Sequence, residues 1–213
     1  MKQLKQEFIK LSPSERLYQY DRPVIAITGG IATGKSTVTK LLSEKGLKII
    51  DADQLVKDIY AQEEAKNFIR TNFPEAWVNE NIEFKKLREL FFQDKKVQEA
   101  VEAYIYHRLP GAFKEAAEKI TDQSFYIYDV PLLFERNLQD KVDVTVVVYA
   151  PEKVQIERLI KRDQINPAAA KNILNKQMDI EEKKSKADLV IDNSGTIDKL
   201  GPEVDKIINT LLF

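Results

Sequence analysis

Short apolar runs alternate with longer amphipathic segments along most of the chain. The run Val24–Thr28 follows a proline and precedes two glycines, as expected of a buried parallel strand. Four more runs of this kind follow, at Leu47–Ile50, Phe125–Val130, Val142–Tyr149 and Ala187–Ile191. Because at least one helical pattern separates each run from the next, the sequence predicts a five-stranded, mostly parallel sheet with helices on both faces. The expected fold class is α/β, doubly wound.

Two insertions are expected between these strands. Residues 51–124 contain no clear strand, and their aromatic and charged residues recur at helical spacing, which predicts a helical insertion at about 55–117. Its expected helices are Leu55–Gln62, Lys66–Phe73, Phe84–Phe92 and Val97–Ala117. Residues 152–184 suggest two charged helices around Asn166 and Pro167, a composition that suits a mobile lid. The core is then formed by residues 23–54, 118–151 and 185–213.

Residues 1–22 precede the first strand and look different from the rest. Leu4, Phe8 and Leu11 have a spacing compatible with a short amphipathic helix, and a polar stretch follows. We interpret this segment as an N-terminal extension of the domain at 23–213, and the sequence suggests no function for it.

Composition narrows the possible functions. The chain has 213 residues, 43% of them hydrophobic and 31% charged, which suits one compact domain with insertions. A net charge of -1 provides no overall attraction to nucleic acid or to an anionic membrane, so neither is an expected partner. No apolar run approaches the ~20 residues that cross a bilayer. The absence of cysteine removes disulfides, thiolate catalysis and cysteine-bound zinc, and favours a cytoplasmic location.

The segment Gly29–Ser36 reads Gly-Gly-Ile-Ala-Thr-Gly-Lys-Ser and matches the phosphate-loop pattern G-x-x-x-x-G-K-[ST]. Its glycines let successive N–H groups surround an anion, and the helix that follows presents its positive N-terminus. Lys35 would add a charge at the β- and γ-phosphates, and Ser36 would offer a hydroxyl to Mg²⁺. Because strand, loop and helix occur in the required order, we expect a P-loop NTPase-type fold that binds nucleotide; a ligand-free glycine turn is the alternative.

Carboxylates follow two other predicted strands, whose carboxyl ends share the rim of the sheet with the loop. Asp51 and Asp53 follow the second strand, and their side chains would share a side if the chain stayed extended. Asp53 could meet an acceptor hydroxyl or cap a helix. Asp129 ends the third strand, where it could reach a metal or cap the next segment.

Basic residues in two helical patterns are further candidates. Arg158 and Arg162 are four apart on one predicted helix and share a face, which could contact phosphate in a lid or lie in solvent. His107, the one histidine, is flanked by aromatic residues and would be either packed at the surface or in contact with substrate. A single histidine also excludes multi-histidine metal sites.

The ordered set of motifs resembles the dephospho-coenzyme A kinases, small P-loop kinases. The resemblance runs from Pro23 to Phe213. It rests on ITGGIATGKST at Ile27–Thr37, IDAD at Ile50–Asp53, the His107 region, DVPLLFE at Asp129–Glu135, ERLIKRD at Glu157–Asp163, Gln177, and ADLVIDNSG at Ala187–Gly195. It implies transfer of the γ-phosphoryl of ATP to the ribose 3′-hydroxyl of dephospho-coenzyme A, with Mg²⁺, and a helical acceptor-binding region beside a lid.

The resemblance also implies roles for individual residues. Asp53 resembles the carboxylate that orients the acceptor hydroxyl, and Lys35 and Arg162 would stabilise the transferring phosphoryl. Asp53, His107 and Leu132 would bind the acceptor, while Ser36 and Asp129 would hold the metal. The expected nucleotide contacts are Gly30, Ile31, Ala32, Thr33, Gly34, Lys35, Ser36, Thr37, Arg158, Arg162, Asn193 and Gly195.

This chain departs from the family pattern at several positions. Ala32 and Thr33 replace a glycine and a serine of the usual loop, and Arg108 and Leu109 separate His107 from Pro110. The stretch Asn79–Lys86 lacks the usual Asp-Gly turn. The alternatives are a P-loop kinase for a nucleoside monophosphate or a shikimate-like alcohol, and a catalytically silent ATP-binding module. A GTP switch is disfavoured because residues 175–179 do not fit an Asn-Lys-x-Asp motif.

Overall fold

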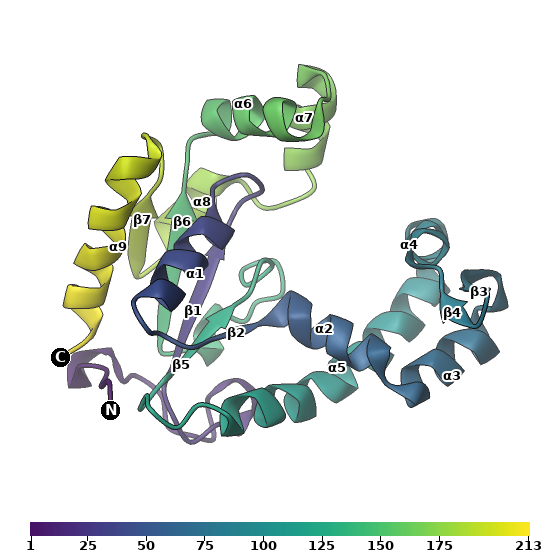
Figure 1. The fold of residues 1–213 in the computed structure, drawn as a ribbon, viewed down its shortest axis with the longest axis horizontal. Coiled ribbons are helices and arrows are strands. Elements are labelled where there is room, and N and C mark those ends of the chain that lie inside the picture. Colours follow the sequence, from purple (N-terminus) through teal and green to yellow (C-terminus); the bar gives the residue numbers. More distant parts are fainter. The chain divides into compact units, whose positions relative to one another are not determined.

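The computed structural model describes residues 1–213, apart from the side chain of Ile197. The chain divides into two compact units (Figure 1). The first, here called the sheet unit, comprises Met1–Asp51 and Ile120–Phe213, and the second, the helical unit, comprises Ala52–Lys119. No helix in the described part of the chain has both the length and the apolarity needed to cross a bilayer.

Five parallel strands form the sheet unit's central layer, in the order β2-β5-β1-β6-β7. Their bounds are β1 Val24–Gly29, β2 Ile49–Asp51, β5 Tyr126–Asp129, β6 Val144–Tyr149 and β7 Leu189–Asp192. Every residue of β1 and β6 is buried, which explains why their sequences are continuous apolar runs without alternation. The expected α/β fold with a five-stranded parallel sheet is confirmed.

Helices cover the sheet. Helix α1 (Lys35–Glu44) packs against α9 (Ile197–Leu211), and α9 also contacts β7. Between β6 and β7 lie three helices, α6 (Glu152–Asp163), α7 (Pro167–Leu174) and α8 (Ile180–Lys186). Two helices were expected there, so that prediction was wrong: Asp179 accepts from two amides and starts α8 after a short irregular link.

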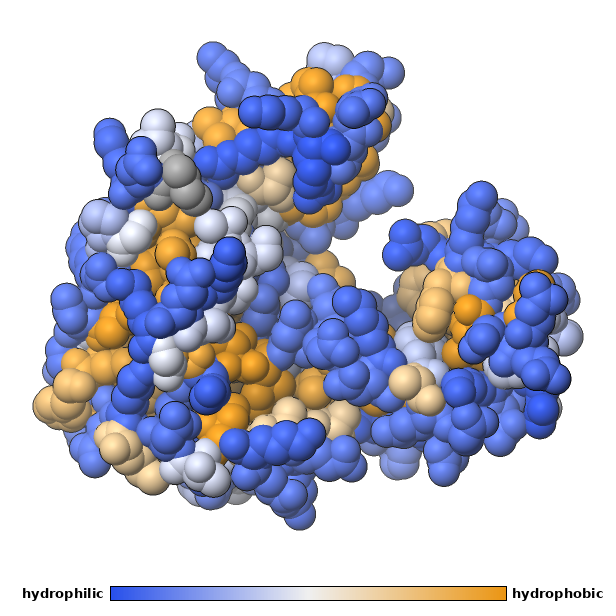
Figure 2. All heavy atoms as spheres, viewed as in Figure 1, coloured by the Kyte–Doolittle hydropathy of each residue, from blue (hydrophilic) through white to orange (hydrophobic). Residues whose placement is uncertain are grey.

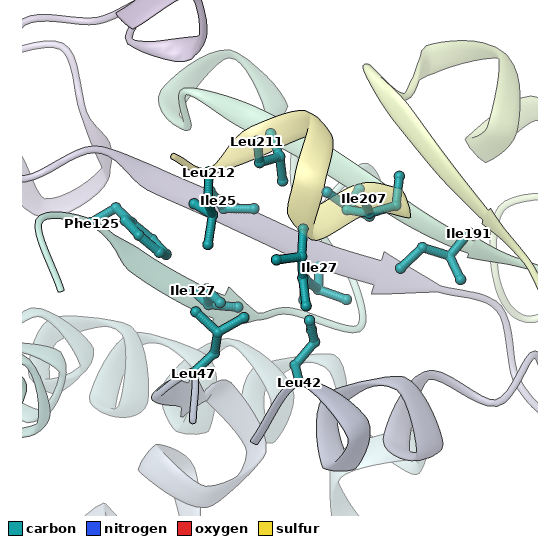
Figure 3. Close-up of a pocket in the computed structure, with 12 residues that line it drawn as sticks. Ile25, Ile27, Leu42, Leu47, Phe125, Ile127, Ile191, Ile207, Leu211 and Leu212 are labelled. Atoms are coloured by element: carbon teal, nitrogen blue, oxygen red, sulfur yellow. The ribbon is translucent and has the colours of Figure 1, made fainter. Parts of the chain in front are cut away.

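The core of the sheet unit is apolar and closely packed. Side chains from β1, β5, α1 and α9 point toward one another and enclose a cavity of about 20 Å³ (Figure 3). Its lining is entirely apolar, so the cavity suits no polar ligand. Figure 2 shows hydrophilic residues over much of the molecular surface, with the apolar residues gathered between them.

The helical unit contains α2 (Ala52–Ala61), α3 (Glu63–Asn72), α4 (Phe84–Gln93) and α5 (Lys95–Glu118), close to the four expected helices. It also contains a hairpin that the sequence did not predict, formed by β3 (Trp77–Val78) and β4 (Asn81–Ile82). Its turn residues Asn79 and Glu80 have φ of 49° and 59°, a left-handed conformation usually supplied by glycine. Without glycine, this turn carries a weak sequence signal.

The N-terminal segment does not form the expected amphipathic helix. It contains short 3₁₀ turns at Gln6–Phe8 and Leu17–Gln19, and residues 13–15 form another turn. Lys2 bridges to Gln123 and Leu4 to Leu212, beside the start of β5 and the end of α9. We call residues 1–22 the strap, because they are joined to the domain along their length.

A buried ion pair fixes the strap to the sheet. Arg16 Nε donates to Asp143 Oδ2 at 2.8 Å, and both side chains are almost fully buried. Asp143 also accepts the amides of Lys10, Leu11 and Val24. Burial raises the pKa of Asp143, but hydrogen bonds from Arg16, Val24 and Leu11 outweigh it, so the pKa lies below its ordinary value of 3.8.

Candidate active site

The loop between β1 and α1 has the conformation that its sequence predicts. Gly34 adopts a φ of +92° immediately before α1, and a Cβ added there would lie 2.2 Å from Asn193 Nδ2. Both the backbone angle and the close approach therefore require glycine. Thr33 Oγ1 donates to the carbonyl of Gly30 at 2.9 Å and closes the loop on itself.

Four amides at the end of this loop have no acceptor. With every loop residue described, no hydrogen bond is found from the backbone N–H of Ala32, Gly34, Lys35 or Ser36. These groups precede or begin α1, where the helix dipole favours negative charge. The loop therefore provides a cluster of unused donors suited to a phosphate group.

Lys35 forms an ion pair with Asp129, which ends β5. Asp129 is 5% exposed, so the pair lies largely out of water. The sheet places the two residues together because β5 pairs directly with β1, with Asp129 opposite Ile27. The structure thus brings together two of the predicted site residues.

Arg158 and Asn193 donate hydrogen bonds to backbone carbonyls of the loop. The guanidinium of Arg158, from α6, donates to the carbonyls of Ala32 and Thr33 at 3.3 Å each and to that of Asn193 at 2.8 Å. Asn193 Nδ2 donates to the Thr33 carbonyl at 2.7 Å. Both side chains therefore support the loop from α6 and from the segment after β7.

Arg162 has different surroundings one turn further along α6. Its guanidinium pairs with the adjacent Asp163 through two hydrogen bonds, at 2.7 and 2.8 Å, and its side chain is 62% exposed. The hydrogen bonds that Arg162 donates to the Asp163 carboxylate raise the pKa of Arg162, so its charge is retained. In this conformation Arg158 contacts the loop and Arg162 lies at the surface.

A further ion pair, between Lys183 and Glu135, supports the start of the loop, and sequence reasoning did not single it out. Lys183 of α8 is fully buried and its Nζ lies 2.8 Å from Glu135 Oε1. The same Nζ donates to the carbonyls of Gly29 and Pro131 at 3.3 Å. Lys183 stands in the run Glu-Glu-Lys-Lys-Ser-Lys, where nothing local distinguishes it from a solvated lysine.

The remaining predicted nucleotide and acceptor contacts of the sheet unit lie near strand ends. Gly195 is exposed in the turn after β7, and Leu132 is 36% exposed in the segment after β5. Thr37 lies in the first turn of α1, where its amide bonds the Gly34 carbonyl at 3.0 Å. Gly30 lines a pocket of about 230 Å³ with residues of α6, the end of α7 and the link before α8.

Two predicted site residues belong to the helical unit. Asp53 lies in the first turn of α2 and is exposed, and His107 is exposed on α5. The chain does not stay extended after Asp51, because α2 begins at Ala52. The condition under which Asp51 and Asp53 would share a side, an extended chain, is therefore not met.

Comparison with known proteins decides the family. A family model described as dephospho-CoA kinase matches residues 23–199, most of the chain. A dephospho-CoA kinase of Fusobacterium nucleatum is 40% identical over 190 residues, covering 88% of this chain and 98% of that protein. One from Bacillus licheniformis is 34% identical over 192 residues, covering 88% and 96%. The chain belongs to the dephospho-CoA kinase family.

Solved structures agree with this assignment. A dephospho-CoA kinase from Campylobacter jejuni superposes with a TM-score of 0.65 at 26% identity, covering 87% of this chain and 95% of that one. The Thermus thermophilus protein TT1252 superposes with a TM-score of 0.79 at 27% identity, covering 89% and 97%. As a member of the dephospho-CoA kinase family, the chain is a kinase with ATP as co-substrate.

The family match includes the kinase motifs but not the first 22 residues. The phosphate loop, Asp129, Arg158 and Lys183 all lie within the segment matched to the dephospho-CoA kinase family. The strap at residues 1–22 precedes that segment. The kinase motifs and the strap are therefore distinct parts of this chain.

Proposed function

We propose that the protein transfers the γ-phosphoryl group of ATP to the ribose 3′-hydroxyl of dephospho-CoA, giving CoA and ADP. The observation that carries this proposal is the match of residues 23–199 to the dephospho-CoA kinase family with an intact phosphate loop. In the reaction the hydroxyl oxygen bonds to the γ-phosphorus, the bond to the β–γ bridging oxygen breaks, and ADP leaves with that electron pair. The hydroxyl proton passes to a base or to water.

The loop and Lys35 bind the phosphates in this proposal. The unused amides of Ala32, Gly34, Lys35 and Ser36 supply hydrogen bonds to the phosphate oxygens. Lys35 is paired with Asp129, and in this proposal its ammonium exchanges this carboxylate for a phosphate oxygen when the nucleotide binds. The Asp129 carboxylate would then face a metal ion instead of the Lys35 ammonium.

Mg²⁺ fits the groups that the loop offers. Ser36 provides a hydroxyl and Asp129 a carboxylate, both oxygen ligands of the kind that Mg²⁺ prefers. The described residues contain no cluster of three or more acidic, histidine or cysteine side chains that could hold a metal ion. That suits Mg²⁺ at a kinase site, where one or two protein oxygens act together with phosphate. A bound Mg²⁺ would neutralise charge on the phosphates.

Positioning residues complete the proposed mechanism. Asp53 accepts a hydrogen bond from the acceptor hydroxyl and orients it; in a loose transition state this positioning contributes more than basicity. Arg158 keeps the loop in shape, and Arg162 contacts the transferring phosphoryl after it leaves Asp163. His107 and Leu132 contact the acceptor in this proposal.

The segment after β7 has a supporting part in nucleotide binding. Asn193 stabilises the loop through the Thr33 carbonyl. In this proposal the following turn, ending at Gly195, contacts the nucleotide base, as the resemblance to the family implies.

The function is tested by measuring ADP release from Mg-ATP with dephospho-CoA, AMP, CMP, shikimate or no acceptor. We expect acceptor-dependent ADP release with dephospho-CoA and a product heavier by one phosphate. ADP release with AMP or shikimate instead would assign the protein to another small-molecule kinase. Tight ATP binding without turnover on any acceptor would indicate a silent module and would contradict the proposal.

A further inference from the structure

Lys183 is an unusual lysine for its position in the chain. It lies on the charged helix α8, and its side chain has no exposed surface. All three of its ammonium hydrogens have acceptors: Glu135 Oε1 and the carbonyls of Gly29 and Pro131. Burying a lysine costs free energy unless its charge is paired. The question is therefore what a buried, fully hydrogen-bonded lysine does at this position.

These contacts join three segments of the site. Gly29 begins the phosphate loop, and Pro131 follows two residues after Asp129. Thr28 Oγ1 also donates to the Pro131 carbonyl, at 3.1 Å, so β1 and the segment after β5 share one acceptor. Lys183 therefore joins α8 to the start of the loop and to the segment that follows Asp129.

Glu135 extends the connection to the link before α8. Its Oε1 accepts the Met178 amide at 3.1 Å as well as Lys183. Next to it, Gln177 Oε1 accepts the amide of Ile31, inside the phosphate loop, at 3.2 Å. The link at Gln177–Met178 is thus bonded both to the loop and to Glu135.

The pair is poorly built for stability alone. Glu135 Oε2 is buried, and no hydrogen-bond partner for it is found among the described residues. A partly satisfied buried ion pair is often no more stabilising than apolar residues of similar volume. Such departures from good packing are expected at functional sites.

We propose that Lys183, paired with Glu135, is a positioning residue for phosphoryl transfer. It acts through its contacts. It holds the Gly29 carbonyl at the start of the loop, and it fixes the positions of the loop, the segment after Asp129 and α8 relative to one another. The phosphate site and the segment that follows α7 then move as one body. This inference rests on the proposed kinase function and assigns a role to a residue outside the motif.

The test compares Lys183→Met with the double variant Glu135→Gln/Lys183→Met. Lys183→Met leaves the Glu135 carboxylate buried without its cation and is expected to unfold more easily. The double variant removes both charges, restoring stability while still lacking the bonds to Gly29 and Pro131. Lys186→Met is the matched control, because Lys186 is on the same helix in an exposed pair with Glu182.

Each variant is assayed well below its melting temperature. For the double variant we expect kcat to fall about 30-fold or more, since a shift of about 1 Å in a catalytic group can cost 10²-fold. The KM for dephospho-CoA should change by less than about threefold, because the acceptor is not touched. Lys186→Met should match the wild type. A folded double variant with wild-type kcat would overturn the proposal and leave Lys183 a structural residue.

Amide hydrogen exchange gives a readout that needs no acceptor. In the double variant, exchange should rise together in residues 29–37 and 177–183, with the rest of the sheet unit unchanged. Unchanged exchange in both segments would contradict the proposal. If the wild type phosphorylates another acceptor, the proposed function fails, and the same kcat comparison on that acceptor still decides the role of Lys183.

Discussion

The two ends of the sheet unit each contain a buried ion pair, and the two pairs differ in how completely they are satisfied. At the amino ends of the strands, Asp143 accepts from Arg16 and from three backbone amides. At the carboxyl ends, Glu135 shares one oxygen between Lys183 and an amide, and its other oxygen has no partner among the described residues.

The difference between the two ion pairs indicates that one serves the stability of the fold and the other the reaction at the phosphate loop. Arg16 and Asp143 join the strap to the start of β6, away from the phosphate loop, and their hydrogen bonds are complete. Lys183 contacts the Gly29 carbonyl at the start of the loop, and its partner Glu135 has an incomplete set of hydrogen bonds. We infer that the first pair stabilises the fold and that the second positions the site.

The largest effect is expected from Asp143→Asn, and it should be confined to stability. Removing this charge leaves the Arg16 guanidinium buried without its partner, which costs about 3–5 kcal/mol. The melting temperature should fall by roughly 10 °C, while kcat at 25 °C stays near the wild-type value. Thermal unfolding and the coupled ADP assay check this, and a large loss of kcat in folded protein would break the proposed separation.

The same variant has a pH signature. The pKa of Asp143 is lower in the folded than in the unfolded chain. The ionised Asp143 therefore adds to the free energy of unfolding above about pH 4, and this contribution is lost as the pH falls through the pKa of the folded chain. Wild-type stability should therefore fall more steeply on acidification than that of Asp143→Asn. Parallel curves would contradict this assignment.

Gly34→Ala tests the phosphate loop, which lies at the carboxyl ends of the strands. The added Cβ would lie 2.2 Å from Asn193 Nδ2 at a φ of +92°, so the loop must change shape. We expect turnover to fall by at least about 100-fold through misplacement of the phosphates. Its matched control is Gly201→Ala, where no atom lies within 4 Å of an added Cβ. Comparable activity of the two variants would remove the loop from the mechanism.

Arg158→Ala and Arg162→Ala distinguish binding from turnover. Arg158 holds three carbonyls, and losing hydrogen bonds of a charged donor costs about 1.5–3 kcal/mol, so the KM for ATP should rise 10- to 100-fold. Arg162→Ala should lower kcat with little change in acceptor KM. Steady-state kinetics measure both, and an Arg162→Ala effect limited to acceptor KM would refute its assignment to the phosphoryl group.

Asp53→Asn tests the acceptor side. We expect ATP affinity close to wild type and kcat lower by at least about tenfold, given that general bases contribute 10²–10⁴-fold. Equilibrium ATP binding and turnover are measured on the same preparation. Unchanged turnover would exclude Asp53 from the mechanism.

The smallest effect is expected from Lys10→Ala in the strap. Lys10 pairs with Asp188, but its side chain is 44% exposed and solvent screens the interaction. Exposed ion pairs contribute at most about 1 kcal/mol to the free energy of unfolding, so the melting temperature should change by a few degrees or less. A loss as large as that of Asp143→Asn would show that stability at this end does not depend on burial of the pair.

Local patterns predicted much of the fold and the loop. The apolar runs correspond to β1, β2, β5, β6 and β7 because buried parallel strands lack alternation. The loop followed from glycine and lysine at fixed spacing, which determine its conformation and its charge. These features depend on neighbours within a few residues.

Features that depend on distant partners were missed. Arg16 and Asp143 are 127 residues apart, so the strap looked like a free amphipathic segment. Lys183 is 154 residues from Gly29, and its burial has no local signal. The roles of Asp53, His107 and Arg162 stay predictions because they depend on the bound acceptor and nucleotide.

The most direct test of the central claim is the position of the transferred phosphate. ADP release from Mg-ATP should be compared for dephospho-CoA and for its 3′-deoxyribose analogue, with the product located by mass and phosphorus NMR. We predict one phosphate on the 3′-oxygen for each ADP formed, and no acceptor-dependent ADP release with the analogue. Equal release with both compounds, or phosphate at another oxygen, would contradict the account.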